Sequence, residues 1–370
     1  MSAADQAGRW FEDLLADVVA RSLRELFSPE VLVGRAPDDR PSDMRVTVRS
    51  FGSTEALGIR ATFETGRQRQ QVWAGHRQIQ ARGAPPVDHP DVLRLVNELV
   101  QAIGDHYLGR AQWLGSAEDP DHLCRRAIRA MFEIRKDSVD VADALLARAF
   151  DLEPRGLYLA WRAQIRAIRR VEKHATDPAD LVGEGQAFAA QALELEPNNS
   201  MVLATVANTM GHLIGNREKS LILARRSVLL NPANPMAWWS LSSANVYGGS
   251  ADASYRSAVH ARSLALLSPH RFWWDNQLFG SAVVLGRLDE ATCLAELAHS
   301  QNDAFRPPLR YLVALYANAG REEEAVAAAA KLREIEPDFS YERLVRDEEY
   351  PASLLQRAPG LDLDRISSLA

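Results

Sequence analysis

Cysteines are few in this sequence, and long apolar runs are missing altogether. The two cysteines, Cys124 and Cys293, are too few for a disulfide framework or a cysteine-based zinc cluster, so they indicate reduced thiols. No window approaches the roughly 18 uninterrupted apolar residues of a membrane-spanning helix. The amino terminus has no basic region followed by an apolar run, so it does not resemble a secretory signal. We therefore expect a soluble cytoplasmic protein that makes no contact with a membrane.

An excess of basic residues is also missing. The 370 residues carry a formal net charge of −6, which disfavours a dominant nucleic-acid-binding surface but is compatible with a local basic patch. Binding of nucleic acid through this chain alone is therefore not expected. Hydrophobic residues make up 46% of the sequence and charged residues 25%, which is typical of a globular protein.

Motifs for catalysis and cofactor binding are missing as well. The sequence has no phosphate-binding glycine loop of the GxxxxGK[ST] or GxGxxG type, and no HExxH or CxxC pair. Nine histidines are scattered without the spacing of metal ligands, and neither cysteine has an obvious base nearby in the sequence. We expect no enzymatic activity, no bound metal and no cofactor.

The second half contains a phrase that recurs at nearly regular intervals. Examples are "AQALELEP" and "RRSVLLNP", which read as helices stopped by a proline that cannot continue the hydrogen-bond ladder. The prolines lie 43, 35, 37 and 68 residues apart, and because 68 is twice 34, one further unit is expected to end near Asp303 without a proline. These prolines are Pro154, Pro197, Pro232, Pro269 and Pro337.

Small residues keep a fixed register within this period. Gly286 and Gly320, Ala291 and Ala325, and Ala295 and Ala329 form pairs of equivalent residues, each pair 34 residues apart. Small side chains at such positions let a second helix approach the first closely. With a period near 34 residues and two helices per unit, this half of the chain resembles tetratricopeptide repeat (TPR) proteins.

The resemblance implies an all-α TPR superhelix of about six repeats over residues 118–337. A capping helix and tail over residues 338–370 would close its last apolar face. The repeats are expected at 120–154, 155–197, 198–232, 235–269, 270–303 and 304–337.

Residues 1–112 follow a different pattern and predict an α+β module. Apolar residues recur at helical spacing over "WFEDLLADVVARSLRELF" and again over 92–108. Between these helices, short runs that are apolar throughout or alternate with period two predict strands. The predicted order is helix, strand, three-stranded meander, helix. The predicted strands are 31–34 ("VLVG"), 44–51, 57–65 and 70–79.

Three phrases of this module resemble the TolB-like domain. They are "FEDLLADVVARSL", "QVWAGH" and "VLRLVNELVQAI", and they are similar to parts of the domain that precedes TPR arrays in bacterial adenylate-cyclase-related proteins and winged-helix transcriptional regulators. The family's first strand and its upstream output domain are absent, and "RAPDDRPSD" replaces a helix. The resemblance implies a degenerate sensory module in bacterial signalling or transcription control. Such a chain either acts on a separate partner or is a fragment of a longer protein.

The TPR resemblance also implies a concave groove lined by fixed positions of each first helix. Successive helical residues point about 100° apart, so Trp273 is expected to face the groove while Phe272 and Trp274 pack against neighbouring helices. Aromatic residues and arginine are common interface anchors, and asparagines in TPR grooves hold extended peptide backbone. Alternatively, one tryptophan packs against the next repeat and the asparagines only solvate the surface. The groove residues implied are Asn208, His212, Trp239, Tyr247, Trp273, Asn276, Arg310 and Asn318.

Two neighbouring first helices carry several arginines. These side chains either merge into one basic docking patch for an acidic or phosphorylated partner, or form a solvated face balanced by nearby acids. The arginines are Arg125, Arg126, Arg129, Arg162, Arg166 and Arg169.

Taken together, the sequence predicts a non-enzymatic regulatory scaffold or sensor that binds a partner protein or peptide segment in its groove. A homodimer is compatible with the sequence. The alternative is a small-molecule sensor with a metabolite in the groove or at the junction with the amino-terminal module. An open, long groove would favour the first function, and a closed apolar pocket with a few converging polar groups would favour the second.

Overall fold

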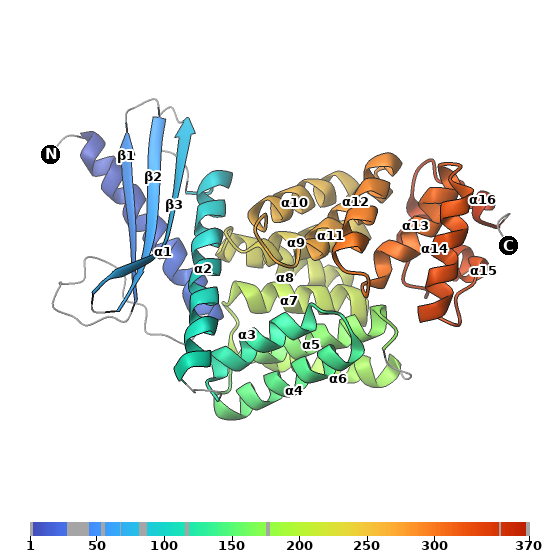
Figure 1. The fold of residues 1–370 in the computed structure, drawn as a ribbon, viewed down its shortest axis with the longest axis horizontal. Helices are drawn as coiled ribbons and strands as arrows, with labels where there is room; N and C mark the ends of the chain where they lie inside the picture. Colours follow the sequence, from blue (N-terminus) through green and yellow to red (C-terminus); the bar gives the residue numbers. More distant parts are fainter. Residues whose placement is uncertain are drawn as a thin grey trace.

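The computed structural model describes residues 3–27, 44–52, 56–66, 68–80, 87–114, 118–174, 178–347 and 349–367. An α+β module comes first, and pairs of antiparallel helices follow it, so that the strands lie at one end of the molecule and the carboxyl terminus at the other (Figure 1). The fold class predicted from the sequence is confirmed. The module consists of α1 (Ala3–Leu26), β1 (Met44–Gly52), β2 (Ala56–Thr65), β3 (Gln70–Gln80) and α2 (Pro90–Leu114).

The three strands form one antiparallel sheet in the order β1-β2-β3. Their alternation sends Ile59, Phe63 and Ile79 to one face, where they are buried against α1 and α2 in a shared core with Phe11 and Leu95. No described element covers the other face of the sheet (Figure 1). The meander is confirmed, and the strand predicted at 31–34 lies outside the described residues.

Six helix pairs make up the array, as the repeat period predicts. Each second helix packs on the first through small residues: Ala291, Ala295 and Ala298 of α12 are fully buried. The turns after α11 and α13 require glycine, because Gly286 and Gly320 have φ of 72° and 73°. The pairs are α3 (Pro120–Met131) with α4 (Lys136–Leu152), α5 (Gly156–Val171) with α6 (Pro178–Leu195), α7 (Ser200–Thr209) with α8 (Arg217–Leu230), α9 (Pro235–Tyr247) with α10 (Ala251–Leu264), α11 (Arg271–Val284) with α12 (Leu288–Gln301), and α13 (Arg306–Asn318) with α14 (Glu322–Ile335).

Two departures from regular pairs affect the concave side. The last turn of α7 continues as a π-helical segment, η1 (Met210–Ile214), a form that is rare and often found at functional sites. After α14 the chain does not leave the array. It folds back as α15 (Tyr341–Arg346), a 3-10 turn η2 (Ser353–Arg357) and α16 (Asp364–Ser367).

The amino-terminal module packs directly on the array. The Glu25 carboxylate at the end of α1 accepts hydrogen bonds from the Ser200 backbone N–H (3.1 Å) and from the Asn231 side chain (2.8 Å). α2 stands between the sheet and the helix pairs (Figure 1), and Leu264 of α10 joins the core of the module. The two parts therefore share buried surface.

Candidate binding cavity

The concave side of the array holds a partly open cavity of about 820 Å³, which we call the central cavity. Its walls come from α5, α7 with η1, α9, α11 and α13, together with the carboxyl-terminal segment. These first helices are buried along most of their length because neighbouring repeats cover them on both sides. The lining residues that matter below are Gln164, Glu172, Asn208, His212, Trp239, Tyr247, Trp273, Asn276, Gly280, Tyr311, Glu349, Tyr350 and Leu354.

The chain's own carboxyl-terminal segment covers one side of the central cavity. Glu349 forms an ion pair with Arg170 at the end of α5 (2.9 Å), and Asp338 forms one with Lys173. The Tyr350 hydroxyl donates to the buried Glu336 carboxylate (2.7 Å). The repeats would otherwise present an open groove on this side.

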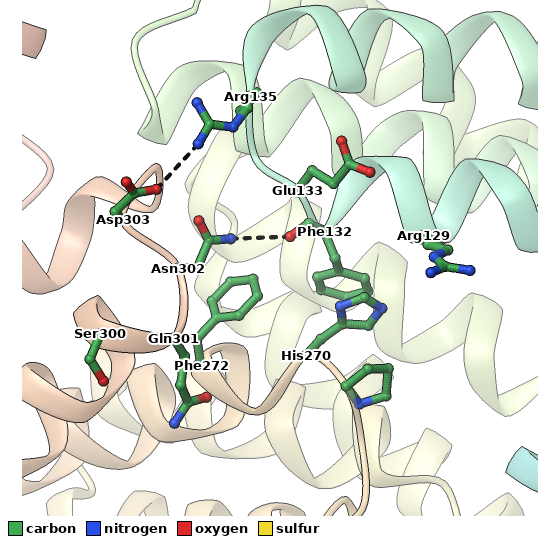
Figure 2. Close-up of a pocket in the computed structure, with 11 residues that line it drawn as sticks. Arg129, Phe132, Glu133, Arg135, His270, Phe272, Ser300, Gln301, Asn302 and Asp303 are labelled. Atoms are coloured by element: carbon green, nitrogen blue, oxygen red, sulfur yellow. Dashed lines mark hydrogen bonds and ion pairs between the residues drawn. The ribbon is translucent and has the colours of Figure 1, made fainter.

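A second contact closes the array between its first and fifth repeats (Figure 2). Arg135 pairs with Asp303 (3.3 Å), and the Asn302 amide donates to the Phe132 carbonyl (3.2 Å). The His270 ring stacks on Phe132 with centroids 4.5 Å apart. A separate pocket of about 590 Å³ opens outward beside this contact. These contacts narrow the groove to a cavity that stays partly open.

Two tryptophans form one wall of the central cavity. Trp239 and Trp273 stack with centroids 5.0 Å apart and planes 18° from parallel, and the Trp239 indole N–H donates to the Trp273 carbonyl (3.2 Å). They are only 3% and 6% exposed. Phe272 and Trp274 are equally buried. The row of three aromatics therefore serves mainly as core, and only Trp273 of the three contributes to the cavity wall.

The middle of the cavity is polar, with neutral side chains. His212 bonds through Nε2 to the Ser243 hydroxyl (2.7 Å), and its ring meets Tyr247 edge-on. Burial lowers the pKa of His212 to about 4, so the ring is neutral at physiological pH. The Asn208 amide donates to the Gln164 side chain (2.6 Å).

Several buried polar atoms that line the cavity have no partner in the described part of the chain. They include the side-chain oxygens of Asn208 and Asn276 and the indole N–H of Trp273. Buried polar atoms are almost always hydrogen-bonded. These atoms have almost no solvent-accessible surface, so a guest molecule reaches them only when the side chains rotate.

Two of the predicted groove residues do not reach the cavity. Arg310 is completely buried and donates through Nε to Glu336 (2.9 Å). The side chain of Asn318 accepts from the Asp362 backbone N–H (3.0 Å). The prediction for these two is corrected: the carboxyl-terminal segment packs over the positions that the repeat register assigns to a ligand.

The six arginines do not merge into one basic surface. Arg162 and Arg166 both bond Asp143 (2.9 and 2.6 Å), and Arg169 bonds Asp140 (2.8 Å). Arg125 lies over the Phe27 ring at the junction with α1, whereas Arg126 and Arg129 are exposed. The acids of α4 balance the arginines of α5, which matches the alternative raised by the sequence.

One lining residue, Glu172, is not among the sequence predictions. It is 1% exposed, and its Oε2 accepts from the Arg306 backbone N–H (3.2 Å), while Oε1 has no partner among the described residues. Burial raises the pKa of this carboxyl to about 7, against the opposing effect of Arg310 and Arg306. Gln164, Ile168 and Glu172 follow one another at intervals of four residues, so they share one face of α5. This spacing could have revealed Glu172 from the sequence.

The buried carboxyl of Glu172 should make stability depend on pH. Because its pKa is raised from 4.5 to about 7 on folding, the folded state binds the extra proton, and stability falls as pH rises between these values. We expect the free energy of unfolding of Glu172→Gln to depend less on pH than that of wild type. At pH 8 it should exceed the wild-type value by about 2–3 kcal/mol. Urea titrations of both proteins at pH 5 and pH 8 measure this. If the free energy of unfolding changes by the same amount between pH 5 and pH 8 in both proteins, the prediction is wrong.

None of the described helices combines the length and apolar character needed to cross a bilayer. Within the same residues, no three histidine, cysteine, aspartate or glutamate side chains are grouped as metal ligands.

Known proteins resemble this chain in fold only. No protein-family description matches the sequence, and no curated protein matches it. Among solved structures, MamA is 19% identical, with 48% of this chain and 93% of MamA covered and a TM-score of 0.33. YrrB, described as a TPR protein with an unusual peptide-binding site, is 15% identical over 52% of this chain and 93% of its own, with a TM-score of 0.33. The pilus biogenesis factor PilW is 16% identical, covering 64% and 98%, with a TM-score of 0.40.

Proposed function

We propose that this chain is a non-enzymatic regulatory binding protein that holds a short segment of a partner protein in the central cavity. The observation that carries the proposal is that the concave side already holds a chain segment. Residues 349–354 lie along it, with Glu349 on Arg170 and Leu354 beside Gly280. A partner's segment would find the same aromatic walls, with the Asn208 and Asn276 side chains beside them.

A small molecule is the second candidate ligand, and the closure of the cavity favours it. Ion pairs from Arg170 and Lys173 to the carboxyl-terminal segment, together with the contact between Arg135 and Asp303, narrow the space. Its volume of about 820 Å³ lies within the range of drug-sized ligand sites, roughly 300–1,000 Å³. A metabolite with hydrogen-bond donors and a flat apolar body would fit these walls.

Gly280 provides a matched pair of variants to test the cavity. A Cβ at this position meets only Leu354 Cδ1, at 3.5 Å, so Gly280→Ala fits, whereas the Gly280→Phe side chain projects into the cavity. We expect Gly280→Ala to keep the ligand that co-purifies with wild type and Gly280→Phe to lose it at an unchanged circular dichroism spectrum. Mass spectrometry of the purified complexes distinguishes a protein from a small ligand. Retention by both variants would overturn the proposal.

We also propose the biological setting and the division of the chain. The amino-terminal phrases that resemble TolB-like domains support a role in bacterial signalling or transcription control, in the cytoplasm. The proposed division is an amino-terminal module over 1–112, TPR repeats over 118–337 and a capping segment over 338–370. The fold and the composition are consistent with this division.

A further inference from the structure

The uncovered face of the sheet carries a row of basic side chains far from the walls of the central cavity. Strand alternation places Arg49, Arg60 and His76 on this face, away from α1 and α2 (Figure 1). The register sets Arg49 opposite Arg60 and Arg60 opposite His76, one on each strand. All three are exposed. Cβ atoms of directly opposite residues lie only about 5 Å apart, so the row is dense in positive charge.

Nothing in the described structure balances this row. The side chains of Arg49 and Arg60 have no hydrogen-bond or ion-pair partner among the described residues. Of the described strand residues on this face, Glu64 alone is acidic, and it lies opposite Arg45 at the far end of β2. Like charges directly opposite one another destabilise a sheet. The row therefore has no explanation in packing, and it stands in a chain whose net charge is −6.

An aromatic side chain lies beside the row on the same face. Phe51 is 53% exposed, and its ring covers Gly58, the residue opposite it on β2. Gln78, opposite Gly58 on β3, adds an amide next to the ring. A flat face that combines arginines with an exposed ring and amides has the groups that contact phosphates, stack on bases and bond base edges.

We propose that this basic sheet face, formed by Arg49, Phe51, Arg60 and His76, binds single-stranded nucleic acid. The arginines contact neighbouring phosphates, and a base stacks on Phe51. The charge of the row favours an anionic partner, and the ring beside it gives a base a surface on which to stack. A bilayer would require more apolar surface than Phe51 and Val72 supply, since these are the large apolar side chains exposed on this face of the described strands.

Fluorescence anisotropy of the full chain with short labelled oligo(dT) and oligo(U) tests the proposal. Two phosphate contacts, from Arg49 and Arg60, predict a log–log salt slope near −1.4, or about a 7-fold loss of affinity between 50 and 200 mM salt. Phe51→Ala should weaken binding about 10-fold, because one stacked base is lost.

Arg60→Glu separates binding from folding. It places a carboxylate between Arg49 and His76, so it should raise the melting temperature while lowering the affinity at least 10-fold. Arg256→Glu makes the same charge change on α10, where Arg256 is exposed without a partner in the described chain, and should leave the affinity unchanged within about 2-fold. Three results would overturn the proposal: no binding at 50 mM salt, equal losses in both variants, or capture by phosphatidylserine vesicles in place of the oligonucleotides.

Discussion

Replacing Arg310 by leucine is expected to lower the free energy of unfolding by about 3–5 kcal/mol. Arg310 and Glu336 are both 0% exposed, and the guanidinium bonds the carboxylate through Nε and Nη2. Without the arginine, Glu336 stays buried with only the Tyr350 hydroxyl and the more distant Arg306 as partners. The loss of a partner for a buried charge is costly because the charge cannot return to water.

Urea denaturation followed by circular dichroism measures this loss. The control is Arg346→Leu, whose pair with Glu342 is 76% and 75% exposed; it should change stability by no more than about 0.5 kcal/mol. The double variant Arg310→Leu/Glu336→Leu removes both charges and should recover part of the loss. A loss below about 1 kcal/mol in the single variant would mean that the pair does not stabilise the sixth repeat, and the prediction would be wrong.

Glu25→Ala is expected to lower the free energy of unfolding by about 2–4 kcal/mol and to loosen the amino-terminal module from the repeats. The carboxylate accepts from the Ser200 backbone N–H, the Ser200 hydroxyl and the Asn231 side chain. Alanine would leave these buried donors without an acceptor, at about 1–3 kcal/mol for each group that stays unsatisfied. Burial raises the pKa of Glu25, so part of the cost of keeping its charge is removed in the variant.

Hydrogen exchange of α1 and α7 shows where the Glu25→Ala variant loosens. Faster exchange is expected at the amino end of α7 and the carboxyl end of α1, with the inner repeats unchanged. Glu12→Ala is the matched control, because Glu12 bonds Ser50 within the module and should loosen α1 against β1 only. Uniform faster exchange over the whole chain would contradict a local docking role for Glu25.

The sequence predicts the helix pairs well because their contacts are local. Ala291, Ala295 and Ala298 belong to a register that repeats every 34 residues, and each pair folds within about 30 residues. Trp273 is also placed on the concave side by this register, as the structure has it. In the amino-terminal module, alternation alone predicts which side chains of β2 face the helices.

Closure of the cavity could not be predicted in the same way. The contact between Arg135 and Asp303 joins residues 168 positions apart, and it depends on the small rotation from each repeat to the next, which accumulates along the array. Arg310 and Asn318 occupy the predicted register, yet the chain's own tail packs on them, which no periodic pattern reveals. The pairing of Asp143 with the arginines of α5 could have been predicted, because Asp143 lies on α4, the helix that precedes them.

The central claim, that a ligand occupies the central cavity, is tested most directly by photo-crosslinking. p-Benzoylphenylalanine at position 276 replaces an asparagine whose side-chain oxygen has no partner in the described chain and which lines the cavity. The same group at position 256, on the exposed side of α10, is the control. Irradiation of cells that contain the native ligand should give one covalent adduct from position 276 and none from position 256. Adducts from position 256 alone, or the same adducts from both positions, would contradict the account.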